Sequence, residues 1–346
     1  MNAIDFFCGG GGITRGLIQA GINVVFGLDS NPECKKTYEE NNHIPYLVRN
    51  VQEVTAEALI EEFPILQDNE ELLMVGCAPC QPFSVLNPNN PNEHRSVNLL
   101  NEFGRIVQGI HPAHILVENV PGLKGRGGEV LQEFLDMLDA EGYRYDFNII
   151  NAKNYGVPQN RRRFVLIASN RFQPNIPPAT HGEGLLPYVT VYDAIHGYPA
   201  LEAGENNEDI PNHRAAGLSD INMQRLQATP ANGGSRTDWP QELWLNCHEK
   251  FNGHTDVYGR MEWQRVAPTL TVKCFSISNG RFAHPEQNRA ISLREAAALQ
   301  TFPDDYIFYG SLQEIGKQIG NAVPVNLAKC VGAVSYTHLR AHETGR

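Results

Sequence analysis

The sequence predicts an α/β fold in which helices flank a mostly parallel, doubly wound sheet. Short apolar runs typical of buried strands alternate with helical segments through about residue 170. The first run, residues 4–7, leads into a glycine-rich turn at 8–12 and then a helix over 14–20. This order is typical of nucleotide-binding sites. Open sheets of this kind bind ligands just beyond the carboxyl ends of their strands.

The second expected strand, residues 24–28, ends at Asp29. A carboxylate there can accept hydrogen bonds from both hydroxyls of a ribose, as it does in dinucleotide-binding dehydrogenases. The glycine loop, however, has no basic residue before Arg15. The loop would therefore tolerate a cationic cofactor without phosphate groups, and a dehydrogenase remains the alternative at the level of the fold.

Two further strands end in side chains that can do chemistry. Residues 72–75 precede the motif Pro79-Cys80-Gln81-Pro82-Phe83-Ser84, and residues 114–117 precede Glu118-Asn119-Val120. A cysteine nucleophile and an acid at the ends of two strands suit covalent attack on an aromatic ring. A triplet of arginines at 161–163 runs directly into another apolar strand, 164–167.

Other interpretations of Cys80 stay open. Cys77-Ala78-Pro79-Cys80 has the spacing of a redox dithiol, although thioredoxin-like folds lack a glycine-rich cofactor loop at their first strand. The other cysteines form no second CxxC pair, so we expect no metal site. Cys80 could also pack as a small hydrophobic residue, but its position between two prolines favours an ordered loop.

The composition indicates a globular protein with room for about two domains, since the chain has 346 residues and 41% hydrophobic content. We find no apolar stretch near the roughly 18 residues of a membrane span. The first apolar run contains Asp5 and lacks the basic flank of a secretory signal. An odd number of cysteines, seven, suits a reducing compartment. We expect a cytoplasmic protein without a membrane partner.

The net charge of -11 argues against non-specific binding of nucleic acid, which needs concentrated Lys and Arg. A single locally basic face would nevertheless be enough to bind a short duplex. The arginines that could supply such a face are Arg161, Arg162, Arg163, Arg225, Arg236, Arg260, Arg265 and Arg281.

The motifs taken together resemble, in order, those of the DNA (cytosine-5)-methyltransferases. They are residues 5–12, 79–84, 118–120, 159–163 (Gln-Asn-Arg-Arg-Arg) and 320–324 (Gly-Asn-Ala-Val-Pro), with 289–303 similar to the segment before the last motif. The resemblance covers about residues 3–334 and weakens between about 172 and 255. It implies the Rossmann-like fold of S-adenosylmethionine-dependent methyltransferases, together with a smaller target-recognition domain.

The resemblance implies S-adenosyl-L-methionine as cofactor, with S-adenosyl-L-homocysteine as product. The matching cofactor positions are Phe7, Gly9, Gly11, Asp29, Asn50, Val51, Pro79, Asn321 and Val323. Asn50 departs from the family, which usually has Asp there to hold the adenine amino group. Because an Asn carbonyl can accept the same hydrogen bond, we expect weaker cofactor binding and not its loss.

The resemblance also implies a mechanism. The Cys80 thiolate would add to carbon 6 of cytosine, so that carbon 5 can attack the methyl group. Glu118 would hold the ring at N3 and the exocyclic amine, Arg163 would contact the ring oxygen, and Arg161 would brace the site. The residues expected near the substrate are Gln81, Ser84, Asn119 and Val120. The cytosine would have to be flipped out of double-stranded DNA.

The expected domains are discontinuous. Residues 1–171 plus 289–334 would bind the cofactor and carry out catalysis, 172–288 would recognise the target, and 335–346 would be a non-native tail. In the recognition segment, residues 232–236 (Asn-Gly-Gly-Ser-Arg) form either a base-reading loop or an ordinary glycine turn. We expect a monomer, functionally paired with a cognate restriction endonuclease if it belongs to such a system. An RNA cytosine-5 methyltransferase is the alternative, and a non-catalytic binding module is disfavoured by Cys80, Glu118 and Arg163.

Overall fold

The computed structural model describes residues 1–67, 69–79, 99–249 and 256–343. The chain divides into two compact units. Unit 1 consists of Met1–Asn151, Arg162–Ala179 and Val323–Arg346, and unit 2 consists of Ala152–Arg161 and Thr180–Ala322.

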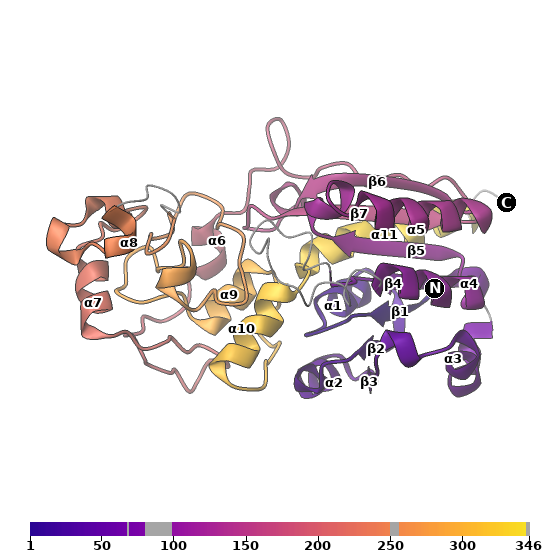
Figure 1. Cartoon of the computed structure of the whole chain (residues 1–346), viewed down its shortest axis with the longest axis horizontal. Coiled ribbons are helices and arrows are strands. Elements are labelled where there is room, and N and C mark those ends of the chain that lie inside the picture. Colours follow the sequence, from indigo (N-terminus) through magenta and orange to yellow (C-terminus); the bar gives the residue numbers. More distant parts are fainter. Residues whose placement is uncertain (68, 80–98, 250–255, 344–346) are drawn as a thin grey trace. The chain divides into compact units, whose positions relative to one another are not determined.

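Unit 1 is built on a seven-stranded sheet in the order β3-β2-β1-β4-β5-β7-β6 (Figure 1). The strands are β1 (Asn2–Phe6), β2 (Asn23–Asp29), β3 (Tyr46–Val48), β4 (Leu72–Gly76), β5 (His114–Asn119), β6 (Arg144–Asn151) and β7 (Arg162–Ser169). All neighbouring pairs are parallel except those of β7, which runs antiparallel to both β5 and β6. The carboxyl ends of β1, β2, β4 and β5 therefore meet at one edge of the sheet, together with the amino end of β7.

The central strands form because their sequences are apolar on both faces. Every residue of β4 and of β5 is buried, whereas β6, at the edge of the sheet, stays partly exposed. Strands covered on both faces read as continuous apolar runs and not as an alternating pattern. The expected doubly wound α/β fold is therefore confirmed for unit 1.

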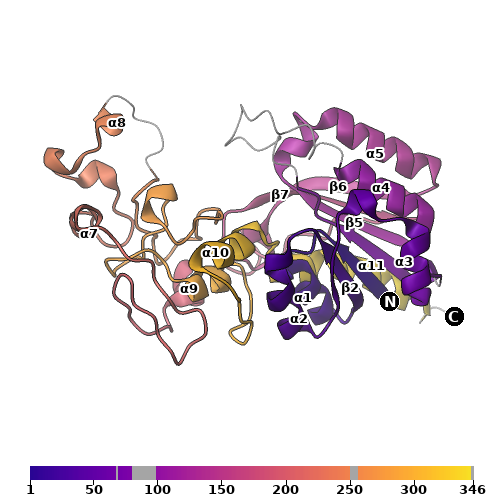
Figure 2. The same ribbon diagram turned by 60° about the horizontal axis from the view of Figure 1, so that its bottom comes forward.

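Helices cover both faces of this sheet. They are α1 (Gly12–Gln19), α2 (Lys35–Asn42), α3 (Ala56–Glu62), α4 (Leu99–Ile110), α5 (Gly128–Ala140) and α11 (Val325–Glu343). Figure 2 shows α3, α4 and α5 along one face and α1 on the other. Gly16 of α1 packs so closely on α11 that an added Cβ would lie 2.5 Å from that of Ala328. None of the described helices is both long enough and apolar enough to cross a membrane.

Unit 2 contains short helices joined by irregular segments. The helices are α6 (Val191–Ile195), α7 (Asp220–Gln227), α8 (Asn246–Glu249), α9 (Leu293–Leu299) and α10 (Leu312–Asn321). Irregular backbone leaves carbonyl groups without ladder partners, and buried carbonyls need hydrogen bonds. Arg260, which is 2% exposed, donates to the carbonyls of Thr229, Leu226 and Gln287. Buried arginine side chains thus supply hydrogen bonds to backbone carbonyls in unit 2, as strand pairing does in unit 1.

Residues 289–322 belong to unit 2 by their packing, although we expected 289–334 in the large domain. Arg289 makes a bidentate ion pair with Glu295 at 2.7 Å on both nitrogens, and its Nε donates to the carbonyl of Leu201. Arg294 donates to the carbonyls of Pro211 and Pro303. These bonds tie α9 to the segment that precedes α7.

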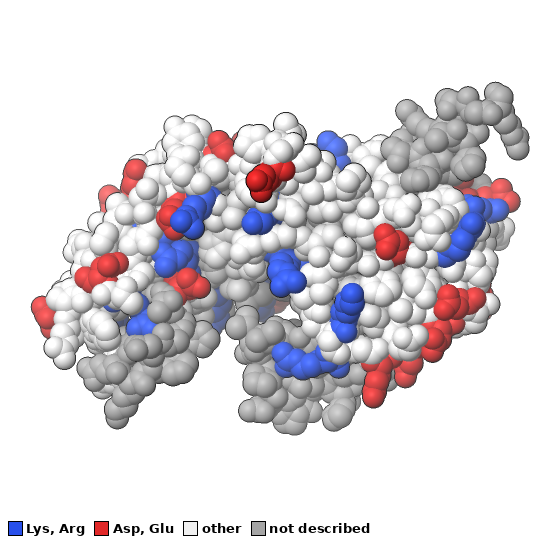
Figure 3. Space-filling view, turned by 90° about the horizontal axis from the view of Figure 1, so that it is seen from above, with Lys and Arg blue, Asp and Glu red and all other residues white. Residues whose placement is uncertain are grey.

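The expectation of a basic face made by the scattered arginines is wrong for several of them. Arg161, Arg225, Arg236 and Arg260 are each 9% exposed or less, since their guanidinium groups are used inside the protein. Among the others, Arg265 is exposed and pairs with Glu262 at 2.9 Å. On the face shown in Figure 3, Lys and Arg are spread among uncharged residues, and some of them lie beside Asp or Glu.

Candidate active site

The glycine loop after β1 has a backbone conformation that depends on its small residues. Gly9 and Gly11 have φ angles of 48° and 83°, in the left-handed region that glycine adopts at no steric cost. Phe7 has a φ of 61°, which is uncommon for a residue with a bulky side chain and marks a local constraint. Its N–H donates to the carbonyl of Leu28 at 2.7 Å, which fixes the turn against β2.

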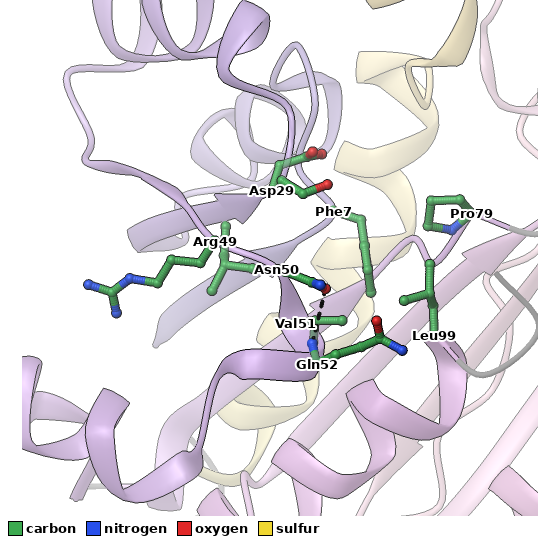
Figure 4. Close-up of a pocket in the computed structure, with 10 residues that line it drawn as sticks. Phe7, Asp29, Arg49, Asn50, Val51, Gln52, Pro79 and Leu99 are labelled. Carbon is green, nitrogen blue, oxygen red and sulfur yellow. Dashed lines mark hydrogen bonds between the residues drawn. The ribbon is translucent and has the colours of Figure 1, made fainter. Parts of the chain in front are cut away.

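A pocket of about 310 Å3 opens beside this loop (Figure 4). Its lining residues are Phe7, Leu28, Asp29, Ser30, Arg49, Asn50, Val51, Gln52, Pro79 and Leu99. They come from the ends of β1, β2 and β3, from the segment after β4, and from the start of α4. The pocket therefore lies at the edge of the sheet where the carboxyl ends of the strands meet, which is where the sequence predicted a cofactor site.

Asp29 is fixed at the end of β2 by backbone N–H groups. Gly9 N–H donates to Oδ2 at 3.0 Å and Asn31 N–H donates to Oδ1 at 2.9 Å. Burial raises the pKa of Asp29 above its usual value, and the bonds from Asn31 and Gly9 oppose that shift. Ser30 N–H also bonds this carboxylate, and of its roughly four acceptor positions at least one remains for a ligand hydroxyl.

Asn50 lies across the pocket at the start of the 3₁₀ turn Val51–Glu53. Its Oδ1 accepts a hydrogen bond from Gln52 N–H at 3.2 Å, which caps the turn. Arg105 of α4 donates to the carbonyls of Val51 and Val54 at 3.1 and 2.9 Å and so fixes the turn to α4. The side-chain carbonyl expected to accept from adenine thus already accepts one hydrogen bond as a cap and keeps its second lone pair.

The pocket offers little to a phosphate group. Arg49 is the basic residue of its lining, and it makes a bidentate contact with Glu62, at 2.7 Å from Nη1 and 3.0 Å from Nη2. Its guanidinium points away from Phe7 and Pro79 (Figure 4). The site therefore suits an uncharged or cationic ligand better than a pyrophosphate.

Asp5 lies beneath the glycine loop and is fully buried. Its Oδ2 accepts from Thr14 Oγ1 at 2.7 Å, and Thr14 Oγ1 also lies 2.8 Å from the hydroxyl of Tyr38. Burial raises the pKa of Asp5 from 3.8 to about 7, and the Thr14 bond lowers it only in part. The base of the loop therefore contains a carboxyl group that can be neutral near physiological pH.

A second group of side chains lies where β4, β5 and β7 adjoin. Arg163 Nε is 2.9 Å from Glu118 Oε1, and these side chains are 13% and 11% exposed. Cys77 Sγ donates to Glu118 Oε2 at 3.5 Å. The antiparallel pairing aligns Glu118 with Val165, so Arg163 is its diagonal neighbour on the same face. Both oxygens of the carboxylate are thus contacted.

Asn119 fixes the start of the cysteine motif. Its Nδ2 donates to the carbonyl of Ala78 at 3.0 Å, and its Oδ1 accepts from Val120 N–H at 2.7 Å. Pro79 follows at the rim of the pocket. The remaining predicted residues of this motif, Cys80, Gln81 and Ser84, lie outside the described residues.

Arg161 is 2% exposed and binds backbone carbonyls of unit 2. Its Nη1 donates to Leu270 O at 2.9 Å, and its Nη2 donates to Gly320 O and Ala322 O at 3.0 and 3.1 Å. Those last two residues flank Asn321, which ends α10. Arg161 therefore fixes the backbone on both sides of a predicted cofactor residue.

The structure brings together only part of the predicted set. Five predicted cofactor residues line the pocket, namely Phe7, Asp29, Asn50, Val51 and Pro79. Gly9 and Gly11 shape the adjoining loop, Val323 is buried in unit 1 outside the pocket lining, and Asn321 belongs to unit 2. Within the described ranges no group of three acidic, His or Cys side chains could hold a metal.

Some residues of the site were missed. Leu99 lies far from the other lining residues in the sequence, and no pattern marked it. The sequence indicated Cys77 only as half of a dithiol, although its place one residue after β4 puts it level with Glu118.

The structure bears on the two interpretations of the loop at 232–236, because Arg236 is 3% exposed and Ser235 caps the turn that follows. This geometry favours an ordinary turn.

Comparison with known proteins agrees with this geometry. Residues 1–335 match the family model described as C-5 cytosine-specific DNA methylase. The chain is 42% identical over 335 residues to the Type II methylase M.HgiDII of Herpetosiphon aurantiacus, covering 95% of this chain and 93% of that protein. It is 31% identical to the Type II methyltransferase M1.HphI of Haemophilus parahaemolyticus, covering 96% and 85%.

The fold agrees with solved structures as well. A prophage-encoded E. coli protein assigned as a DNA modification methyltransferase aligns with a TM-score of 0.77 and 22% identity, covering 98% of this chain and 99% of that one. Dnmt2 of S. pombe aligns with a TM-score of 0.60 and 16% identity, covering 98% and 99%. The chain belongs to the C-5 cytosine-specific DNA methylase family and is a DNA (cytosine-5)-methyltransferase.

Proposed function

We propose that this enzyme transfers a methyl group from S-adenosylmethionine to carbon 5 of a cytosine flipped out of duplex DNA at a specific short sequence, through a covalent bond between Cys80 and carbon 6. The observation that carries the proposal is the contact between Glu118, on the strand beside the one that leads to Cys80, and Arg163 of β7. An acid and a guanidinium are the groups needed to hold the polar edge of a pyrimidine.

The pocket fits the cofactor that the family implies. The Asp29 carboxylate keeps acceptor capacity for a ribose hydroxyl, Phe7 offers an apolar ring, and Pro79 closes the side toward the cysteine motif. Arg49 forms an ion pair with Glu62, so its charge is already balanced and the pocket does not need a phosphate group to balance it. When bound, S-adenosylmethionine would supply the electrophilic methyl group. Gly9, Gly11, Asn50, Val51, Asn321 and Val323 complete the proposed cofactor set.

The protein's own groups would act on the cytosine. Carbon 5 of the ring is a weak nucleophile, so addition of the Cys80 thiolate at carbon 6 divides one difficult step into easier ones. Glu118 would accept from the exocyclic amine and, in its protonated form, donate its proton to N3, which offsets the negative charge that develops on addition. Arg163, which contacts Glu118 on one side, would reach the ring oxygen. Asn119 would set the direction in which the chain leaves Ala78 toward Cys80.

The relatives support a proposal for the biological setting. Both similar proteins named above are Type II enzymes. We propose that this chain likewise belongs to a restriction-modification system, works in the cytoplasm as a monomer, and protects DNA from a cognate endonuclease. We assign target recognition to residues 172–288 and regard 335–346 as a non-native tail.

The test is transfer of tritiated methyl from S-adenosylmethionine to mixed-sequence duplex DNA and, in parallel, to total RNA. We expect label in DNA as 5-methylcytosine, abolished in Cys80→Ser and retained in Cys247→Ser, whose cysteine is exposed and outside the site. Label in RNA alone would contradict the proposed substrate, and normal turnover by Cys80→Ser would contradict the nucleophile.

The covalent step can be tested separately with duplex DNA that carries 5-fluorocytosine. After addition and methyl transfer, elimination requires loss of a proton from carbon 5, and fluorine cannot leave as a cation. The protein should therefore remain linked to the DNA in a denaturing gel. The linked band should be absent in Cys80→Ser; a band of equal intensity would refute the adduct at Cys80.

A further inference from the structure

Cys77 has no role in the function proposed above, yet it contacts the acid of the site. The register of the parallel pair β4 and β5 places Gly76 beside Val117, so the next residues in line are Cys77 and Glu118. Cys77 N–H donates to the carbonyl of Phe6 at 3.3 Å, so the backbone at this point is tied to β1 as well. Both partners in the thiol–carboxylate contact are therefore held by the sheet.

We propose that Cys77 is a positioning residue that holds Glu118 through a hydrogen bond from its S–H group to Oε2. The inference rests on the proposed function, in which Glu118 binds the cytosine. Arg163 Nε contacts Oε1 at 2.9 Å from the β7 side, and Cys77 contacts Oε2 at 3.5 Å from the β4 side. A carboxylate held at both oxygens from opposite neighbours cannot rotate about its last bond without losing a contact.

The contact requires a protonated thiol. Burial raises the pKa of Cys77 well above its ordinary value, and the negative charge of Glu118 raises it further. Cys77 therefore remains an S–H donor over the range in which the enzyme works. The same property makes Cys77 a poor reactive thiolate, which disfavours the redox-dithiol interpretation of the Cys77–Cys80 spacing.

A thiol suits this position because it is a weak donor. Glu118 has to bind a nucleotide that arrives from outside, and a strong donor at Oε2 would compete with the cytosine amine for that oxygen. A weak donor orients the carboxylate before the substrate arrives and then shares the oxygen, whose second lone pair remains free. The expected benefit is a better aligned acid, which acts on turnover and not on cofactor binding.

The kinetic test compares Cys77→Ala and Cys77→Ser with Cys247→Ala as the matched control, because Cys247 is exposed and lies in unit 2. Losing one modest hydrogen bond should lower kcat about fivefold in Cys77→Ala, while KM for DNA and the Kd of the cofactor stay the same. Cys77→Ser keeps a donor and should have a higher kcat than Cys77→Ala, but it should stay below wild type because a hydroxyl is the stronger donor and competes with the cytosine amine. A packing role predicts that Ser, which also lacks the sulfur, is no better than Ala.

A second measurement does not depend on turnover. In a Cys80→Ser background, the rate at which iodoacetamide alkylates Cys77 is followed against pH by mass spectrometry, with and without Glu118→Gln. Removing the carboxylate charge should shift the alkylation profile of Cys77 to lower pH and leave that of Cys247 unchanged. An unchanged Cys77 profile would overturn the contact. If wild-type protein methylates no nucleic acid, the proposed function fails, and this measurement still decides the Cys77–Glu118 contact.

Discussion

Asp5 should make unit 1 less stable as the pH rises, and Asp5→Asn should remove this dependence. The carboxyl is fully buried, and among the described residues its Oδ1 has no hydrogen-bond partner. Burial raises its pKa from 3.8 to about 7. The folded chain therefore binds more protons than the unfolded chain between those values, so stability falls as the pH rises through this window and reaches its lower level above about pH 7.

The size of the effect follows from the shift. Each pKa unit corresponds to about 1.4 kcal/mol, so ionised Asp5 destabilises the fold by about 4 kcal/mol relative to the unfolded chain. An amide cannot ionise, and its oxygen can still accept from Thr14. The stability of Asp5→Asn relative to wild type should therefore increase by about 4 kcal/mol between about pH 4 and about pH 8. Effects of the amide on packing do not depend on pH and cancel in this comparison.

The assay has to report on unit 1. Tryptophan fluorescence does not, because Trp239, Trp244 and Trp263 all lie in unit 2. Amide hydrogen exchange of peptides from β1 and α1, measured by mass spectrometry on both proteins at each pH, reports opening around Asp5 directly. Asp209→Asn, at an exposed position of unit 2, is the control and should show no such trend. A wild-type to Asp5→Asn difference that stays constant with pH would refute the reasoning.

Two other substitutions test the site and its support. Asn50→Asp should bind S-adenosylhomocysteine about tenfold more tightly by titration calorimetry, because a carboxylate has one oxygen for the Gln52 cap and another for a charge-assisted bond; unchanged affinity would remove position 50 from the adenine contact. Gly320→Ala should lower the stability by about 1–3 kcal/mol in thermal unfolding, since its Cβ would lie 2.3 Å from the carbonyl oxygen of Thr271. Gly128→Ala, where a Cβ would meet nothing within 4 Å, should show no loss.

The sequence predicted those parts of unit 1 that are encoded locally. The apolar runs at 72–75 and 114–117 became β4 and β5, with boundaries extended by one or two residues. The glycine loop and Asp29 appeared where expected because turn chemistry and strand ends depend on neighbouring residues. The reversed direction of β7 was not predictable, since an apolar run looks the same in either orientation and only its partners decide between them.

The sequence predicted which residues belong to the candidate site better than it predicted the contacts that these residues make. Arg161 was expected to brace the site, but the carbonyls that it binds lie more than one hundred positions later in the chain. Asn50 was expected to accept from adenine, and that stays a prediction; its oxygen also caps a turn that the sequence did not reveal. Long-range hydrogen bonds from buried arginines also explain why residues 289–322 group with unit 2, because such bonds have no periodic signature in a sequence.

Strand β7 begins directly after the boundary between the two units, and its reversed direction decides which residues reach the active edge of the sheet. In a wholly parallel sheet, the active edge is supplied only by residues that follow strands; β7 instead brings to that edge the residues that precede it. The boundary between the units falls between Arg161 and Arg162, so the arginine that contacts Glu118 is two residues from one bonded within unit 2. Any displacement of Arg161 would be transmitted along two peptide units to the arginine that contacts Glu118. The ion pair with Glu118 thus depends on a backbone anchor that lies outside the sheet.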